Sequence, residues 1–175
     1  TLTQPTTTAD ITAKTLTVTG LKPGINIYGD APEVKVDYSS AQLVGVSAGD
    51  VVTLVSSGAR AVFDDPNAGE GKAITVTGLT LAGLDAGNYT LVQPRPTGTI
   101  LRRAVVFTFA GTTQEYNGTA RSVSVTASPS VAVTLSYADA GGAAITAPVN
   151  AGSYSVTAVA NSANHVGQAL SLIHI

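Results

Sequence analysis

The chain has 175 residues, of which 44% are hydrophobic but only 11% are charged, well below the quarter that is usual in globular domains. Its formal net charge is −2, and it has neither the basic surface that binds nucleic acid nor a basic run suited to anionic lipid. It contains no cysteine, which excludes disulfides and cysteine-ligated metal, and no apolar run approaches the roughly 18 residues of a membrane helix.

Short segments in which apolar and polar residues alternate recur along the chain, and this period of two predicts half-buried β-strands. In chain order the clearest are 15–19, 33–38, 74–77, 122–126, 131–137 and 154–158. Their polar faces are rich in Thr and Ser, so we expect antiparallel sheets with one face on a core and the other in water. No segment of about ten residues or more has helical periodicity.

Turn sequences containing Gly, Asn or Pro separate these segments. They lie at 22–24, 48–50, 67–69, 86–88, 117–118 and 150–152. Glycine and asparagine accept the positive φ that tight turns require, and a spacing of roughly 8–20 residues is typical of a sandwich or barrel. The matching sequences Asn67-Ala68-Gly69 and Asn150-Ala151-Gly152 predict equivalent corners, in which Gly69 and Gly152 both have positive φ.

The sequence also repeats itself with an offset of 89 residues. Thr-Leu-Thr-Gln-Pro at 1–5 returns as Thr-Leu-Val-Gln-Pro at 90–94, and the register continues without a gap to Ile11 and Ile100. Repetition on this scale indicates an array of modules. We therefore interpret 1–13 as the tail of a preceding repeat, 14–102 as a complete repeat and 103–169 as a second, shorter repeat.

Two sets of motifs resemble known families. The run TVTGLTL at 75–81, followed by DAGNYTL at 85–91 and by Gln93-Pro94, is similar to the YDG domain of filamentous-haemagglutinin-like bacterial adhesins. The run YNGTA at 116–120, with PVNAGSY at 148–154 and Ala163-Asn164, resembles the related MBG domain of such proteins. The resemblance implies a secreted repeat protein attached to the bacterial cell surface.

For the fold we expect two small antiparallel β-sandwiches of the immunoglobulin-like kind in tandem, each with its own core, and β-grasp-like modules are the alternative. In the first repeat the predicted core residues are Val34, Val36, Leu54, Phe63, Ile74, Val76 and Leu91. In the second they are Val123, Val125, Val133, Leu135, Tyr154 and Val156.

The final segment, 170–175, differs from the rest because it contains neither Thr nor Gly. Its sequence, Leu-Ser-Leu-Ile-His-Ile, is also the translation of a transposase-based sequencing adaptor. We therefore interpret it as not native and expect it to be frayed or docked only opportunistically. Its deletion should then leave the thermal midpoint of the second repeat unchanged.

The histidines and glycine-rich stretches do not predict a catalytic or phosphate-binding site. A Ser-His-Asp triad needs a histidine as base, and the sequence has only His165, at a turn, and His174, in the final segment. The stretch from Gly69 to Lys72 lacks the remaining residues of a phosphate loop and precedes a strand rather than a helix.

The carboxylates likewise give no metal site or catalytic pair. Asp64, Asp65, Asn67 and Glu70 do not have the alternating spacing of a calcium loop, so we expect a solvated turn. Glu33 and Asp37 alternate along the water-facing side of one strand rather than flanking a cleft. We therefore predict no catalytic, metal-binding or cofactor-binding residue and no cofactor.

Three further groups of residues have ordinary surface or turn explanations. Asn88 and Asn117 match the glycosylation pattern, but both also suit turns, and a bacterial protein is not expected to use them. The lysines give no sign of a buried crosslinking site. They are Lys14, Lys22, Lys35 and Lys72.

Together these features predict a non-catalytic stalk or spacer segment of a large secreted bacterial adhesin, whose partners are the neighbouring repeats of the same chain. Other parts of the parent protein would contact a host glycan or protein. The alternative is a module that itself binds a glycan or host protein. Aromatic rings exposed on turns would favour that alternative, and Tyr28, Tyr116 and Phe63 are the candidates.

Overall fold

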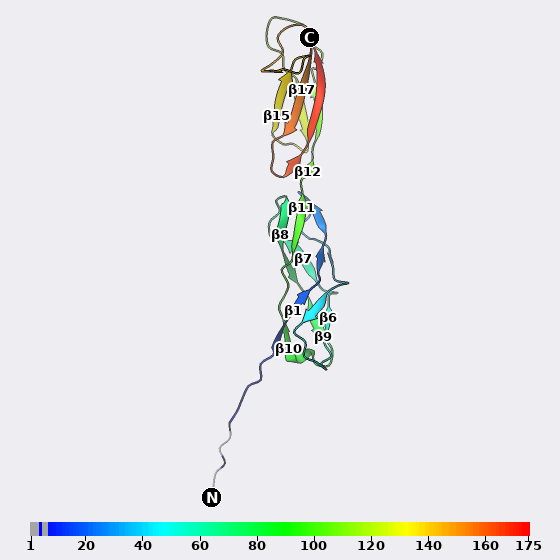
Figure 1. Ribbon diagram of the computed structural model, residues 1–175, viewed down its shortest axis with the longest axis vertical. Coiled ribbons are helices and arrows are strands. Elements are labelled where there is room, and N and C mark those ends of the chain that lie inside the picture. The colour runs from blue at the N-terminus through cyan, green and yellow to red at the C-terminus, as the bar shows by residue number, and fades with distance from the viewer. Residues whose placement is uncertain (1–3, 5–6) are drawn as a thin grey trace. The chain divides into compact units, whose positions relative to one another are not determined.

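The computed structural model describes residue 4 and residues 7–175 and divides the chain into two compact units (Figure 1). The first unit extends to Asn26 and also includes Ala31–Asp65 and Glu70–Thr99; the second comprises Ile27–Asp30, Pro66–Gly69 and Ile100–Ile175. Two short segments of the first sequence repeat thus belong to the second unit. The segment 1–5, on which the repeat was recognised, lies largely outside the described residues.

The predicted all-β class is confirmed, because nearly all regular structure is strand. Among the described residues the one helical element is a 3-10 turn, Ala86–Asn88, so no helix covers a sheet as the β-grasp alternative would require. In the same part of the chain, no helix has the length and apolar character needed to cross a membrane.

Apart from the nine-residue β8, the strands up to residue 101 have six residues or fewer, and together they form several small sheets. They are β1 (Lys14–Thr19), β2 (Lys22–Pro23), β3 (Ile25–Ile27), β4 (Val36–Asp37), β5 (Gln42–Val44), β6 (Thr53–Val55), β7 (Arg60–Phe63), β8 (Gly69–Thr77), β9 (Thr80–Ala82), β10 (Tyr89–Leu91) and β11 (Thr97–Leu101). The sheet orders are β10-β1-β5 and β3-β11-β8-β7, and β2-β4 and β6-β9 form separate pairs.

Strand β1 shows how the alternating sequence positions this fold. Leu16 and Val18 are buried, whereas the threonines between and around them are exposed. Its first half, Lys14–Leu16, pairs in parallel with β10, and its second half pairs antiparallel with β5. One strand therefore connects two parts of the core.

The core of the first unit agrees with the prediction in its principal members. Val34, Phe63, Ile74 and Val76 are buried. The other three predicted residues are half-buried: Val36, Leu54 and Leu91. The prediction omitted several buried side chains, namely Leu16, Val18, Leu79 and Tyr89.

A pentapeptide, Thr-Val-Thr-Gly-Leu, occurs twice in the first unit, at 17–21 and 75–79, and takes the same shape both times. Gly20 and Gly78 each have a φ of +79°. A Cβ on Gly20 would lie 2.1 Å from the carbonyl oxygen of Ser40, and one on Gly78 would lie 2.2 Å from that of Gly58. Both positions thus require glycine, because φ is positive and because a neighbouring backbone carbonyl leaves no room for a Cβ.

The second unit has longer strands. They are β12 (Arg103–Ala104), β13 (Val106–Ala110), β14 (Ser124–Ser128), β15 (Val133–Ala138), β16 (Ala144–Ile145), β17 (Ser153–Ala160), β18 (His165–Val166) and β19 (Gln168–His174). A four-stranded antiparallel sheet has the order β16-β15-β17-β19, and β15, β17 and the red β19 lie side by side in Figure 1. The pair β13-β14 is antiparallel, and β12-β18 is parallel.

The core of this unit centres on Val123, Tyr137, Val156 and Ile173. The predicted Val123 and Val156 are therefore confirmed as buried. The remaining predicted residues are half-buried: Val125, Val133, Leu135 and Tyr154.

The expectation of purely antiparallel sheets needs a correction. The first strand of each sequence repeat pairs in parallel with a strand near the end of that repeat, β1 with β10 and β12 with β18. Alternation of apolar residues identifies a strand but not the direction of its neighbour, so the sequence could not predict this feature.

The expectation of a frayed C-terminal segment is wrong. Residues Ser153–Val159 of β17 pair with Gln168–His174, and Ile173 is completely buried. The backbone of Ile175 also exchanges two hydrogen bonds with that of Gly152. Leu170 and Leu172 nevertheless point outward, 67% and 61% exposed, while Ser171 on the inward side is half-buried. The non-native origin of the segment stays a prediction.

The matched glycines occupy matching corners, as predicted. Gly69 begins β8 with a φ of +157°, and Gly152 directly precedes β17 with a φ of +159°. Both values are positive and nearly identical, and each glycine introduces a long strand. The Asn-Ala-Gly sequence therefore marks the same backbone feature in both repeats.

Candidate functional site

Both histidines contact a serine hydroxyl. His165 Nδ1 lies 2.9 Å from Ser162 Oγ, and His174 Nδ1 lies 3.1 Å from Ser153 Oγ. In a catalytic triad this nitrogen faces the acid, whereas here it faces a serine. Ser162 Oγ also accepts a hydrogen bond from the backbone N–H of Asn164 at 3.2 Å, which closes a local turn. The pair formed by Ser162 and His165 thus has a structural explanation.

The stretch from Gly69 to Lys72 forms the first half of β8. Lys72 Nζ lies 2.5 Å from Asp65 Oδ2, so the ammonium forms an ion pair within the unit. A phosphate loop instead presents backbone N–H groups at a helix N-terminus. The structure gives this stretch the role of a strand.

The carboxylates in question lie in separate surface contacts. Asp64 accepts a hydrogen bond from Thr75 Oγ1 at 2.6 Å and pairs with Arg95 at 3.1 Å. Glu33 pairs with Arg60 at 3.2 Å. No group of three or more His, Asp or Glu residues in the described part of the chain is arranged to hold a metal ion.

Asp37 has a different local environment. The backbone N–H of Ser39 donates to Asp37 Oδ1 at 2.8 Å. This bond, followed by one from the Ser39 side chain and by the charge of Lys22, holds the pKa of Asp37 below its ordinary value. The group is fully exposed and stabilises a turn.

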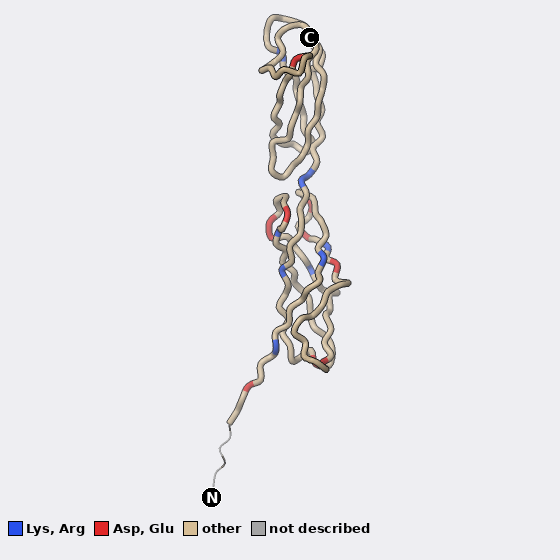
Figure 2. Tube along the Cα trace, viewed as in Figure 1, with Lys and Arg blue, Asp and Glu red and all other residues tan. Residues whose placement is uncertain are grey.

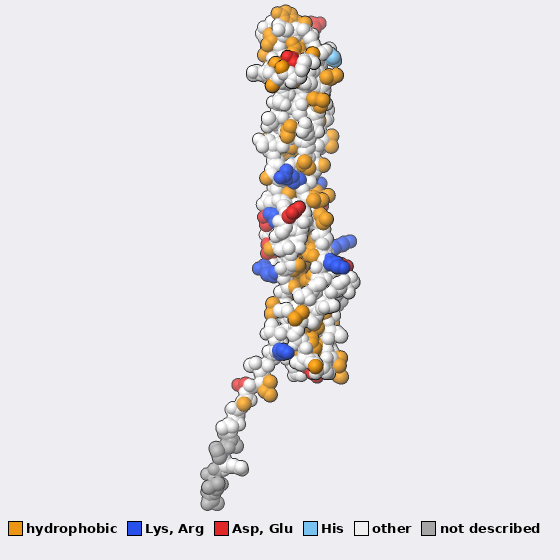
Figure 3. Space-filling model, viewed as in Figure 1, with side chains coloured by type: hydrophobic (Ala, Val, Ile, Leu, Met, Phe, Trp, Pro, Cys, Tyr) orange, Lys and Arg blue, Asp and Glu red, His pale blue; other side chains and the backbone are white. Residues whose placement is uncertain are grey.

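The three aromatic candidates have three different environments. Phe63 is buried in the core, and Tyr28 packs edge-on against His165 with ring centroids 5.2 Å apart. Only Tyr116 of the three is freely exposed, at 60%. On the face shown in Figure 3, hydrophobic side chains are dispersed among polar and backbone atoms. The rings therefore do not form an outward-facing cluster.

The remaining lysine and asparagine candidates also have local partners or exposed positions. Lys14 Nζ donates to Ser47 Oγ at 3.3 Å. Asn117 Oδ1 accepts from the backbone N–H and the hydroxyl of Thr119, which is the geometry of a turn. Asn88 ends the 3-10 turn and is exposed.

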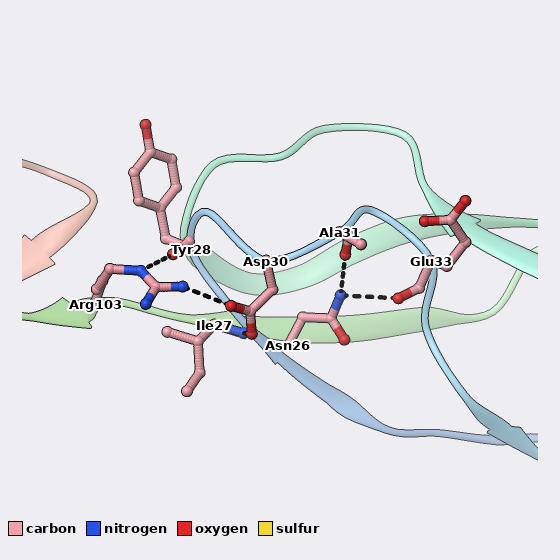
Figure 4. A network of polar contacts seen from close by, with 7 residues as sticks. All are labelled: Asn26, Ile27, Tyr28, Asp30, Ala31, Glu33 and Arg103. Atoms are coloured by element: carbon pink, nitrogen blue, oxygen red, sulfur yellow. Dashed lines mark hydrogen bonds and ion pairs between the residues drawn. The ribbon is translucent and has the colours of Figure 1, made fainter.

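A network of polar contacts in the second unit surrounds Arg103 (Figure 4). Arg103 Nε donates to the carbonyl oxygen of Tyr28 at 2.6 Å, and Nη2 donates to Asp30 Oδ1 at 2.5 Å. The backbone N–H of Ile27 donates to Asp30 Oδ2 at 3.3 Å, which keeps the loop closed. The guanidinium therefore binds a carbonyl and a carboxylate of one loop, a charge-assisted arrangement.

Asn164 binds the other short loop of this unit. Its Nδ2 donates to Asn67 Oδ1 at 2.9 Å, and its Oδ1 accepts from the backbone N–H of Ala68 at 2.9 Å. The backbone N–H of Tyr28 donates to the carbonyl oxygen of Leu101 at 2.8 Å. Residues 27–30 and 66–69 are thus held by side chains at the beginning and near the end of the second repeat.

The sequence analysis did not assign a role to Arg103, Asp30 or Asn164. One signal was available, because the 89-residue offset places Lys14 and Arg103 at the same position of the two repeats. A cation at the first residue of both repeats could have marked the site. Its partners could not have been found without the fold, since 73 residues separate Arg103 from Asp30.

Several hollows in the first unit are large enough to consider as binding sites. One, of about 530 Å³, is lined by residues that include Tyr38, Leu43 and Leu54. Burial raises the pKa of Tyr38 above its ordinary value. Another, of about 430 Å³, is lined by residues that include Lys14 and Asn88.

Charge is unevenly distributed along the chain (Figure 2). After Arg103 the sequence contains only three charged residues: Glu115, Arg121 and Asp139. Four ion pairs among the described residues are all at least partly exposed, and such pairs contribute only about 0–1 kcal/mol each. These ion pairs therefore contribute little to the stability of either unit.

Comparison with known families gives two matches. Residues 12–97 match the YDG domain, and residues 105–175 match the MBG domain. No curated protein and no solved structure matches the chain. The chain is a YDG domain followed by an MBG domain in tandem, as the sequence motifs had predicted.

Proposed function

We propose that this chain is a non-catalytic spacer in the stalk of a large secreted bacterial adhesin, where its domains project a binding region from the cell surface. The observation that carries the proposal is the tandem of a YDG and an MBG domain. Both begin with a strand that pairs in parallel with a strand near the domain's end. A recurring plan of this kind suits a linear array, in which each repeat contacts its neighbours.

The surface chemistry supports the same proposal. The polar faces of the strands carry mainly Thr and Ser, and charged groups are few. Several of the side chains considered as site residues are engaged in turns, in ion pairs or in the core, among them His165, Lys72 and Phe63. A spacer requires folded, soluble modules and has no need of a pocket.

The proposal is tested by lengthening the array. Chains with one, two and three in-register copies of residues 14–102 ahead of residue 103 should gain the same increment in maximum dimension per copy, measured by small-angle X-ray scattering. In a control series, flexible Gly/Ser linkers separate the copies. Its maximum dimension should increase less regularly with each copy, because a random coil grows only as the square root of its length. Collapse of the longer chains into a compact particle would contradict the spacer role.

A second candidate function is direct binding of a glycan or host protein. Tyr116 favours it, because this ring is exposed in the loop between β13 and β14 and tyrosine is common in binding surfaces. Binding of the whole chain to a glycan array, lost in Tyr116→Ala and kept in Tyr154→Phe, would support this function over the spacer.

A further inference from the structure

The two domains begin with the same arrangement of residues. Lys14 of β1 is the register partner of Tyr89 in β10, and Arg103 of β12 is the register partner of His165 in β18. In both cases the residue directly before the later strand is an asparagine, Asn88 or Asn164. Lys14 and Asn88 therefore occupy the positions in the YDG domain that Arg103 and Asn164 occupy in the MBG domain.

In the second unit these positions hold two loops. Arg103 binds the carbonyl oxygen of Tyr28 and the carboxylate of Asp30, and Asn164 exchanges two hydrogen bonds with Asn67 and Ala68. Both loops belong to the YDG part of the sequence, which precedes Arg103 in the chain. The pair formed by a cation and an asparagine thus recognises a Tyr-Gly-Asp loop and an Asn-Ala-Gly loop.

In the first unit the corresponding side chains face an open hollow. Lys14 and Asn88 are exposed and line the hollow of about 430 Å³ together with Ile11–Ala13, Asp50 and Tyr89. The Lys14 ammonium also donates to Ser47 Oγ at 3.3 Å, at the same hollow. The chemistry matches that of the second unit, because an ammonium can also donate to a carbonyl and a carboxylate, although without the fixed fork of arginine. Asn88 can exchange the same two hydrogen bonds as Asn164.

The sequence before Lys14 indicates what covers this hollow. The 89-residue offset aligns residues 8–13 with 97–102, which contain the whole of β11. Ile100 is 4% exposed, whereas its counterpart Ile11 is 101% exposed. An isoleucine in this position belongs in the core of a domain, so residues 8–13 have the sequence of the last strand of another YDG-type domain.

We propose that Lys14 and Asn88 form a docking surface for a preceding YDG-type domain of the same array. The surface binds two loops of that preceding domain, the ones equivalent to 27–30 and 66–69. Lys14 and Asn88 contact them as Arg103 and Asn164 contact the loops 27–30 and 66–69 of this chain. The inference rests on the proposed function, because it requires the domains to stand in tandem. The ring contact of Tyr28 with His165 is not repeated, since the Tyr89 hydroxyl already donates to Asp50 and accepts from the N–H of Ser47.

The test uses an extended chain in which residues 14–89 are placed directly before residue 1. Thr1 then follows Tyr89 as Thr90 does naturally, so the added copy and residues 1–13 together supply a preceding domain in register. With only the added copy labelled with ¹⁵N, amide hydrogen exchange is measured at its Tyr28 and Ala68. The native Tyr28 and Ala68, labelled separately, provide the reference for loops that are docked.

The substitutions are made in the native copy, which carries the docking surface. There, Lys14→Glu combined with Asn88→Ala should speed amide exchange at Ala68 of the added copy by about tenfold, because that N–H loses its acceptor, Asn88 Oδ1. Lys35→Glu, which changes an exposed lysine elsewhere on the same domain, should leave that exchange unchanged. Lys14→Arg should slow exchange at the neighbouring Tyr28 loop. Equal exchange in the double variant and in the unsubstituted extended chain overturns the proposal.

The same chain separates this inference from the spacer role. If scattering shows a regular gain in length but exchange does not respond to Lys14 and Asn88, the spacer role stands and the docking surface falls. If exchange responds but the chain does not lengthen, the docking surface stands and the spacer role falls. If the protection of these amides from exchange depends on protein concentration, the docking surface binds a second chain. That result would also overturn the proposal.

Discussion

The two units are stabilised in different ways although both are small all-β structures. The second relies on long ladders: β17 pairs with β15 from Ser155 to Ala160 and with β19 from Ser153 to Val159, over one compact hydrophobic cluster. Apart from β8, the first has strands of six residues or fewer, and side chains hold several of its loops. Gln93, for example, exchanges two hydrogen bonds with the backbone of Leu79, and Asp85 accepts from the N–H of Val51.

The difference teaches which substitutions each unit should tolerate. A unit with one apolar cluster is most sensitive to lost volume, because a cavity costs both transfer free energy and packing. A unit built from short strands and tight turns is most sensitive where its backbone segments approach closely. Substitutions of surface charges should have the smallest effect on the stability of both units. The effect should be larger in the first unit, because it contains most of the charged residues.

The largest effect is expected at Ile173. Its replacement by alanine should lower the free energy of unfolding of the second unit by about 2–5 kcal/mol, since the side chain is completely buried in the central cluster. Urea unfolding followed by NMR signals of each unit measures it. The control Leu172→Ala removes a 61% exposed side chain and should change stability by about 0.5 kcal/mol or less. Equal effects would mean that the C-terminal segment is not docked.

The next effect is expected at Gly78 in the first unit. Alanine there should cost about 2 kcal/mol or more, because φ is +79° and the new Cβ would meet the carbonyl oxygen of Gly58 at 2.2 Å. Thermal unfolding of the first unit measures the loss. Gly87→Ala is the matched control, since its Cβ would have open space around it. A harmless Gly78→Ala would show that the close approach relaxes easily.

Gly152→Ala separates the effect of backbone conformation from that of a close backbone approach, which is present at Gly78. We expect a loss of about 1 kcal/mol in the second unit, because φ is +159° while the nearest atoms, in the Tyr154 ring, are 3.7 Å away. The cost therefore comes from conformation alone and should be smaller than at Gly78. Chemical denaturation of both variants gives the order, and a reversed order would refute this explanation.

The smallest effect concerns pH. The Ser39 N–H holds the pKa of Asp37 below its ordinary value, so this carboxylate stabilises the first unit above the aspartate pKa of the unfolded chain, about 3.9. That contribution is lost as the pH falls through the folded-state pKa. Asp37→Asn should therefore flatten the acid side of the first unit's stability profile and leave that of the second unit unchanged. An unaltered profile for the first unit would contradict the role of this turn.

Much of the fold could be predicted from the sequence, because alternation and turn residues act locally. The alternating residues around Ile74, Val76 and Val156 are buried as expected, and the glycines at 69 and 152 have the predicted positive φ. The partners of strands are set by tertiary packing, so the parallel pairs remained hidden. The contacts of Arg103 were hidden for the same reason, since they join residues far apart in the chain.

The parallel pairing of β1 with β10 has a mechanical consequence for a tethered chain. The two strands run in the same direction, and β1 lies near the beginning of its domain while β10 lies near the end. A pulling force applied to the two ends of the domain therefore acts along the strands in opposite senses. It loads the hydrogen bonds between Lys14–Leu16 and Tyr89–Leu91 in shear, so they must yield together rather than open one after another.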